Sequence, residues 1–109
     1  MAQRANRFGV YLAVLDPVRG SETAKTRPCA IVSPDEMNRR LRTAILVPLT
    51  SKPKHHPFRV PVEFGGVVGE LLTDQVRSVD KSRLLRQLGT LDRRTSEALA
   101  ATLVHIFWL

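Results

Sequence analysis

Two polar segments separate the short apolar runs in the first half of this sequence. Residues 19–28 combine cations, hydroxyls, one carboxylate and a glycine, and residues 48–52 place two adjacent hydroxyls, Thr50 and Ser51, just after an apolar run. Guanidinium groups bind phosphate oxygens through a planar fork of donors, and hydroxyls can add hydrogen bonds to the same oxygens. These residue types therefore suit a phosphate site on loops that a rigid scaffold holds in place.

The same groups could cut an RNA strand without a metal, because ribose carries its own nucleophile, the 2′-OH. Such cleavage needs a base for the 2′ proton, an acid for the leaving 5′ oxygen, and donors or positive charge for the crowded phosphorane. Glu22 could be the base, while Arg27, Thr50 and Ser51 could bind the phosphate. A structural interpretation stays open, in which Glu22 and Arg27 form a surface ion pair and the hydroxyls cap a strand end.

Basic side chains are concentrated in the first part of the chain. The sequence has 109 residues, with 17 Lys and Arg against 10 Asp and Glu, and a formal net charge of +7. Residues 1–60 hold eleven basic and four acidic side chains, whereas residues 61–109 hold six of each. A one-sided basic excess is typical of a surface that binds nucleic acid, although a merely solvated basic surface has the same composition.

Length and cysteine content indicate one domain, residues 1–109, in a reducing compartment. Cys29 stands alone and cannot form an intramolecular disulfide, and no secretory leader or membrane span is evident, so we expect a cytoplasmic protein. Cys29 lies in an apolar run and is expected to be a core residue rather than a nucleophile. No Cys/His cluster and no glycine-rich nucleotide loop is present, so we expect neither a metal nor a cofactor.

Short apolar runs broken by turn residues predict a mainly β fold, either a compact antiparallel sheet or a half-open barrel. Residues 67–79 fit one long bent strand or two, and residues 58–62, flanked by prolines, fit an edge strand. Long loops are expected at 16–27 and 50–57. The remaining strands are expected at residues 10–15, 28–32, 43–49 and 84–91.

Two helices are expected in addition to the strands. A short one at residues 34–40 would follow Ser33 as its N-cap, with proline at the first helical position. A terminal one at residues 93–107 would follow Asp92 as its N-cap. Leu99, Leu103 and Ile106, at i, i+4 and i+7, give this terminal helix one apolar face.

Three histidines have alternative interpretations. His55 and His56 lie in the second polar loop, where one of them could act as the general acid or both could simply be solvated and contact phosphate. His105 lies in the terminal helix, where a structural role is expected.

The chain resembles the MazF/PemK family of toxin endoribonucleases. Asp-Pro-x-x-Gly-Ser-Glu followed by Arg-Pro is fairly specific for that family, and the further matches occur in one order along nearly the whole chain. The matching segments are residues 15–22, 25–28, 32–34, 47–51, 57–60 and 73–80.

The resemblance implies an SH3-like, CcdB/PemK-type half-open barrel with a short helix and a C-terminal helix, assembled as a homodimer. It implies a toxin of a type II toxin–antitoxin pair that cuts single-stranded RNA at short sequences and leaves a 2′,3′-cyclic phosphate and a 5′-OH. It further implies an antitoxin whose acidic tail fills a basic groove, and the charge of +7 suits such a partner.

The resemblance also assigns residues. Arg27 and Thr50 match the catalytic positions, with Glu22 assisting. Ser51 and Asp74 match further active-site positions. Together with the basic and polar residues around them, the expected RNA-binding set is Arg19, Ser21, Lys25, Ser51, Lys52, Lys54, Asp74 and Arg77.

The C-terminus suggests an alternative. Phe107 and Trp108 resemble the Phe-Trp ending of the related gyrase poison CcdB, in which the tail contacts the target enzyme. This chain could then be a non-catalytic inhibitor of DNA gyrase that acts through Trp108, although such poisons lack the Gly-Ser-Glu and Arg-Pro pattern. A third possibility is an RNA-binding barrel without catalysis.

Overall fold

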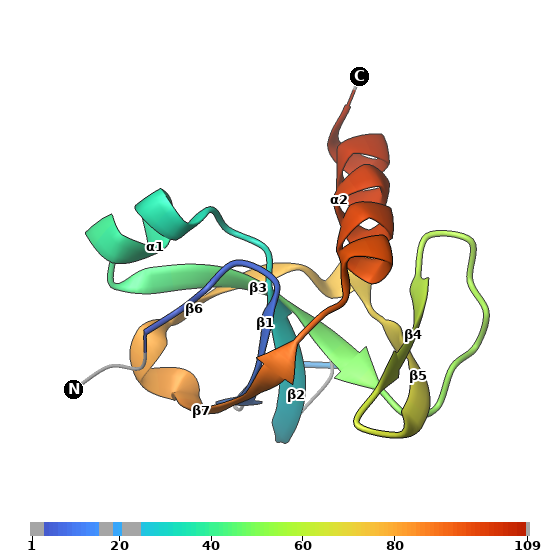
Figure 1. The fold of residues 1–109 in the computed structure, drawn as a ribbon, viewed down its shortest axis with the longest axis horizontal. Coiled ribbons are helices and arrows are strands. Elements are labelled where there is room, and N and C mark those ends of the chain that lie inside the picture. The colour runs from blue at the N-terminus through green and yellow to red at the C-terminus, as the bar shows by residue number, and fades with distance from the viewer. Residues whose placement is uncertain (1–3, 16–18, 21–24, 109) are drawn as a thin grey trace.

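Strands dominate the computed structural model, which describes residues 4–15, 19–20 and 25–108. Figure 1 shows the arrangement, with the two helices on one side of a strongly curved sheet. The strands are β1 (Gly9–Val14), β2 (Thr26–Ile31), β3 (Thr43–Thr50), β4 (Val60–Phe64), β5 (Val67–Leu71), β6 (Arg77–Asp80) and β7 (Leu84–Thr90). The helices are α1 (Asp35–Arg40) and α2 (Arg93–Phe107), and the 3₁₀ turns are η1 (Thr73–Gln75) and η2 (Lys81–Arg83).

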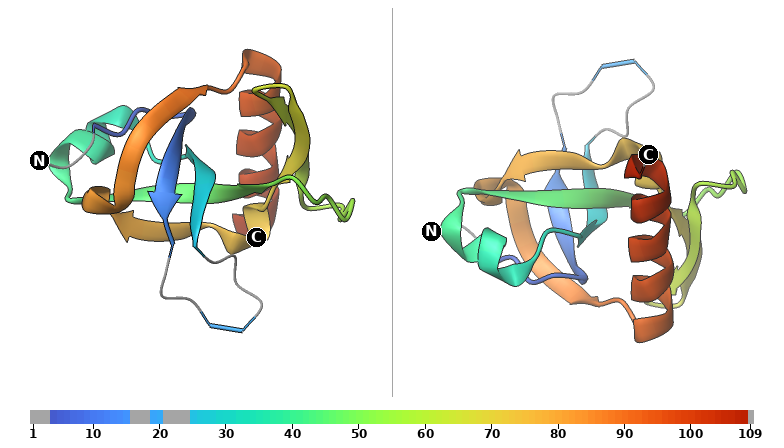
Figure 2. Two further views of the ribbon diagram at one scale, coloured as in Figure 1. Left: turned by 90° about the horizontal axis from the view of Figure 1, so that it is seen from below. Right: turned by 90° about the horizontal axis from the view of Figure 1, so that it is seen from above.

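The sheet is antiparallel throughout, in the order β4-β5-β3-β2-β1-β7, and β6 also pairs with β3. β3 is the central strand: its first half pairs with β6, and its last two residues pair with β5. These pairings turn the sheet into the incomplete barrel seen in Figure 2. The expected mainly β half-open barrel is thus confirmed.

Alternate residues of the same strands supply two apolar clusters. On β3, Ala44 and Leu46 enter the first cluster, whereas Val47 and Leu49 enter the second. Because successive side chains of a strand point to opposite faces, both faces of the sheet are covered. Leu99 of α2 is fully buried in the second cluster, so the terminal helix closes that face.

The N-cap predicted from the sequence is correct for α2 and wrong for α1. Asp92 is the N-cap of α2, and its carboxylate accepts a hydrogen bond from the Thr95 N–H (2.7 Å). For α1 the expected cap is wrong: Pro34 is the N-cap, and the Ser33 hydroxyl instead donates to the Asn38 side chain and accepts from the Ile45 N–H (2.9 Å). Ser33 therefore ties α1 to β3. No helix in the described part of the chain is long and apolar enough to cross a membrane.

Several strand limits differ from expectation. β4 begins at Val60 rather than residue 58, because residues 56–59 form a turn in which the Arg59 N–H donates to His56 O (3.0 Å). Residues 67–79 form two strands, since η1 interrupts them. β2 begins two residues earlier than expected, at Thr26, and thereby includes Arg27.

Candidate active site

Arg27 and Thr50 lie on neighbouring strands at one end of the sheet. β2 and β3 pair with Cys29 opposite Pro48 and Ala30 opposite Val47. Arg27 and Thr50 each lie two residues beyond the Cys29–Pro48 pair, toward the same end of the sheet. Side chains two residues apart on a strand point to the same face, so Arg27 and Thr50 share the face of Cys29 and Pro48.

Arg77 approaches this pair from the other side of β3. It begins β6 and pairs with Leu46, which is on the same face of β3 as Thr50. Burial raises the pKa of the Cys29 thiol to about 12, and the positive charges of Arg77 and Arg27 act in the opposite direction. Both arginines are thus close enough to influence the same buried sulfur. A thiol with this pKa stays protonated at neutral pH, which fits the interpretation of Cys29 as a core residue.

Two arginines hold the end of β1, where the first polar loop begins. Arg77 Nη1 donates to Leu15 O (3.3 Å), and Arg83 Nη1 donates to Val14 O (3.1 Å). The Leu15 N–H donates in turn to Lys25 O (2.8 Å), so the two stems of the loop are joined. Arg77, expected to bind RNA, is therefore also a positioning residue for that loop.

The residues of the first polar loop are only partly described. Ser21 and Glu22, two of the expected site residues, lie outside the described residues. Arg19 and Lys25 are exposed, and Lys25 adopts a positive φ of 65° at the start of the returning strand.

Local contacts orient Thr50. Its Oγ1 accepts a hydrogen bond from the Lys52 N–H (3.1 Å), and a hydroxyl that accepts such a bond keeps its own proton to donate. Gly69 of β5 packs directly on the Thr50 backbone, and a Cβ at that position would overlap the Thr50 carbonyl. Only glycine allows β5 to approach this closely, so it helps to fix the end of β3.

Glu70 is a buried carboxylate that anchors the loop after Thr50. It pairs with Thr50 across β3 and β5, and only 1% of its surface is exposed. Its oxygens accept hydrogen bonds from the Lys54 N–H (3.2 Å) and the His55 N–H (3.0 Å), and Arg59 Nη1 lies 3.6 Å away. His55 has a positive φ of 59°, an unusual conformation that these contacts support.

Asp74 also contributes to this anchor. Arg59 donates two hydrogen bonds to its carboxylate, at 2.9 and 3.0 Å. These bonds from Arg59 hold the pKa of Asp74 below its ordinary value. Asp74, expected to bind RNA, is thus already paired with a side chain of the loop that follows Thr50. Its exposed part can still face a ligand, since the side chain is 48% exposed.

Glu70 and Arg59 were not among the site residues predicted from the sequence. A signal was available for Glu70, because it is a carboxylate between apolar residues in the run from Val67 to Leu72. Carboxylates are rarely buried unless they are paired. For Arg59 the signal was its place in the family-matching segment 57–60, but its partners on β5 and η1 could not be read from the sequence.

The other expected residues after Thr50 are solvent-exposed. Ser51, Lys52, Lys54 and both loop histidines are exposed on the loop between β3 and β4, where cations can meet a polyanion. His105 packs against Phe58, with 5.5 Å between ring centroids, which agrees with a structural role. Among residues 4–15, 19–20 and 25–108, no three His, Cys, Asp or Glu side chains are grouped so that they could hold a metal ion.

We expect Glu70→Ala to lower the free energy of unfolding by about 3 kcal/mol, because two N–H groups and Arg59 lose a buried acceptor. Urea unfolding followed by circular dichroism measures this change. Glu63→Ala removes an exposed carboxylate from β4 and is the matched control, with an expected change within about 0.5 kcal/mol. Hydrogen exchange of the His55 amide should also accelerate in Glu70→Ala. Equal stability of the two variants would show that Glu70 is not an anchor.

The curved antiparallel half-barrel with a C-terminal helix defines a small β-rich protein whose second polar loop carries exposed cations. Comparison with known sequences gives the family. The pattern described as "PemK-like, MazF-like toxin of type II toxin-antitoxin system" matches residues 6–107. The chain therefore belongs to the MazF/PemK toxin family.

Characterised relatives agree with this placement. The chain is 32% identical to endoribonuclease EndoA of Bacillus subtilis over 92% of its own length and 95% of the relative's. It is 38% identical to endoribonuclease toxin MazF of Escherichia coli, where the match spans 59% of this chain and 58% of the relative. A crystal structure of MazF from Deinococcus radiodurans matches with a TM-score of 0.87 and 26% identity, over 98% of this chain and 99% of the other.

Proposed function

We propose that this chain is a metal-independent, sequence-specific endoribonuclease that cuts single-stranded RNA. The observation that supports the proposal is that Arg27 and Thr50 lie at the same end of two paired strands, two residues beyond the Cys29–Pro48 pair and on the same face. The assignment is supported by homology to the endoribonucleases MazF and EndoA. A plain RNA-binding barrel would not need a guanidinium and a hydroxyl directed at one phosphate.

In the proposed reaction, the 2′-oxygen attacks the adjacent phosphorus while Glu22 takes its proton. The bond from phosphorus to the 5′ oxygen breaks, and that oxygen takes up a proton from the solvent, which leaves a 2′,3′-cyclic phosphate and a 5′-OH. Arg27 and Thr50 donate hydrogen bonds to the non-bridging oxygens, whose negative charge grows in the transition state. No oxidant, reductant or water molecule is consumed in this step.

Binding of the flanking RNA falls to the two polar loops. Arg19, Ser21 and Lys25 come from the first loop, and Ser51, Lys52 and Lys54 come from the second. Exposed cations of this kind contact phosphates and hold the strand in register. Asp74 and Arg77 border the same end of the sheet, where Asp74 can accept a hydrogen bond from a base.

The test is to incubate the purified chain with a long RNA in excess EDTA and to map the ends of the products. We expect cuts at one short recurring sequence, with 5′-OH and cyclic phosphate ends and no dependence on added divalent ions. An intact RNA, or cutting that EDTA abolishes, would contradict the proposal.

We propose that the chain is the toxin of its pair, acts in the cytoplasm as a homodimer, and is blocked by an acidic antitoxin. A mycobacterial endoribonuclease of the same fold has been solved in complex with its cognate antitoxin. Net positive charge suits an acidic partner, and apolar side chains exposed on α2 suit an interface. The free thiol of Cys29 suits a reducing compartment.

A second candidate function, poisoning of DNA gyrase, is favoured by one observation: the Trp108 side chain is 80% exposed. A tail that contacts a target protein would present such a residue. The match to MazF-like toxins favours RNA cleavage instead. Adding the same protein preparation to a gyrase supercoiling assay separates the two, and the ribonuclease proposal expects unchanged supercoiling.

A further inference from the structure

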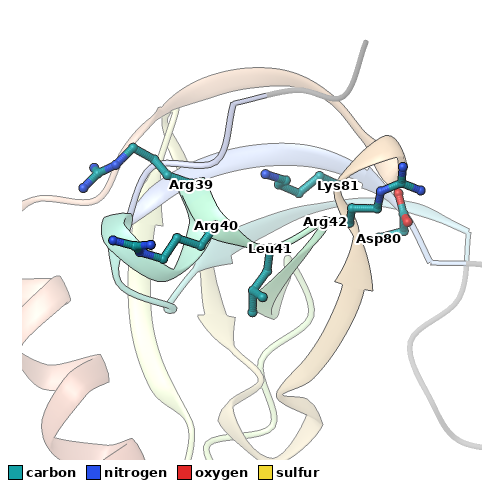
Figure 3. Close-up of a pocket in the computed structure, with 6 residues that line it drawn as sticks. All are labelled: Arg39, Arg40, Leu41, Arg42, Asp80 and Lys81. Carbon is teal, nitrogen blue, oxygen red and sulfur yellow. The ribbon is translucent and has the colours of Figure 1, made fainter.

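A basic hollow lies at the end of the molecule that carries α1. It has a volume of about 450 Å³ and is formed where the end of α1 and the turn into β3 meet the end of β6. Figures 1 and 2 show this end opposite the loop that joins β3 to β4. The lining residues, shown in Figure 3, are Arg39, Arg40, Leu41, Arg42, Asp80 and Lys81.

Cations dominate the lining of the basic hollow. Arg39, Arg40 and Arg42 are exposed. Arg40 forms only a solvent-exposed ion pair with Glu36 (3.5 Å), and such pairs are weak and exchangeable. Lys81 donates to Asn38 O (2.7 Å), so its charge compensates the carbonyl end of α1.

Asp80 is the one carboxylate among the lining residues. Its own strongest interaction is a hydrogen bond from Ser82, whose N–H lies 2.9 Å from Asp80 Oδ1, so this acid is occupied locally. In Figure 3 the Arg42 guanidinium lies beside Asp80, whereas Arg39 and Arg40 extend to the opposite side. Three arginines and one lysine against one acid give the hollow an excess of positive charge that suits an anion.

β3 connects the basic hollow to the candidate active site. Thr43, which pairs with Asp80, begins this strand at the hollow, and Thr50 ends it at the site. The strand from Thr43 to Thr50 spans about 23 Å, a length that roughly seven stacked nucleotides cover at 3.4 Å each. Leu41, which is 44% exposed, adds an apolar surface among the cations on which a base or ribose can rest.

We propose that the basic hollow is a second RNA-binding site, which holds backbone phosphates of the substrate beyond the cut. The proposal rests on the ribonuclease function above. Arginine forks fit phosphate oxygens, and an RNA strand that runs along β3 from Thr50 reaches the hollow after roughly seven nucleotides. The site holds long RNAs more tightly than short ones and makes no direct contribution to the chemical step.

The test compares Arg39→Gln/Arg42→Gln with the control Arg93→Gln/Arg94→Gln, which removes the same charge from exposed positions at the start of α2. The affinity of each double variant is measured for two RNAs, of 8 and 24 nucleotides. Each RNA is centred on a mapped cut, and a 2′-deoxyribose at that position blocks cleavage. We expect the hollow variant to bind the 24-mer about tenfold more weakly, with a salt slope smaller by about 1.4 for two lost phosphate contacts. The 8-mer affinity and its cleavage rate, measured on the unblocked RNA, stay unchanged.

Equal losses on both lengths, or no loss on either, would overturn the proposal. So would a variant that binds both RNAs normally but loses affinity for a polyglutamate peptide, because the hollow would then fit an acidic protein segment. If the chain cuts no RNA, uridylate homopolymers of the two lengths replace the mapped RNAs. A length-dependent loss on these would support the hollow even though the proposed function had failed.

Discussion

A single 2′-deoxyribose at the scissile nucleotide will abolish cleavage of an RNA that the chain otherwise cuts at that position. The reason is that the proposed nucleophile belongs to the substrate, and its removal leaves no group to attack the phosphorus. The measurement is a gel assay of an end-labelled oligonucleotide built around a mapped cut. The expected rate is below detection, whereas the same substitution two nucleotides away leaves cleavage within a few-fold of the all-ribose RNA.

The chemical form of the product ends shows which group attacked the phosphorus. Cleavage that persists at the deoxy position and leaves a linear phosphate would mean that water is the nucleophile. Glu22 would then have a different task, and the geometry of the Arg27 and Thr50 donors would have to serve hydrolysis. Binding of the deoxy RNA, measured in parallel, should equal that of the all-ribose RNA, because the substitution removes the nucleophile and spares the phosphate contacts.

Arg27→Lys and Thr50→Val will each lower kcat for RNA cleavage by about 10²–10³, the usual cost of removing one transition-state donor. Lysine keeps the positive charge at position 27 but replaces the planar fork by a single rotating ammonium. Valine keeps the shape of threonine but lacks the hydroxyl. Single-turnover kinetics at saturating enzyme measure the chemical step separately from binding.

Matched substitutions elsewhere control for general effects. Arg86→Lys and Thr90→Val change the same residue types at exposed positions of β7 and should leave kcat within about twofold. The double variant Arg27→Lys/Thr50→Val should lose less than the product of the two single losses, because both groups act on one phosphate. Near-normal kcat in either single variant, with the fold retained, would move the site away from the β2–β3 pair.

Much of the fold could be predicted from local patterns. Apolar runs of strand length, broken by proline, glycine and polar loops, indicated the strands because a strand has to bury alternate or all side chains to be stable. Asp92 before an amphipathic segment correctly marked the start of α2, since a cap is a local interaction between residues three apart. Ser33 shows the limit of this reasoning. Its hydroxyl does not cap α1 but joins α1 to β3, and this contact cannot be predicted from a local pattern.

Parts of the site were visible in the sequence for a similar reason. Arg27 and Thr50 stand out as a cation and a hydroxyl next to strand ends, and the order of the matching segments pointed to one family. Their joint role at one phosphate stays a prediction, which their location at the same end of two paired strands supports. The roles of all the expected site residues remain predictions, and Ser21 and Glu22 lie outside the described residues.

By itself the sequence determined the residue types, their order, the basic excess and the segments that would become strands, because these depend on neighbours in the chain. Tertiary structure alone decided that Glu70 lies buried below the second loop, that Arg59 joins it to Asp74, and that Arg77 and Arg83 hold the end of β1. Each of these contacts joins residues at least eleven positions apart. Which distant partners meet depends on strand register and sheet curvature, and these follow from the packing of the whole barrel rather than from any one segment.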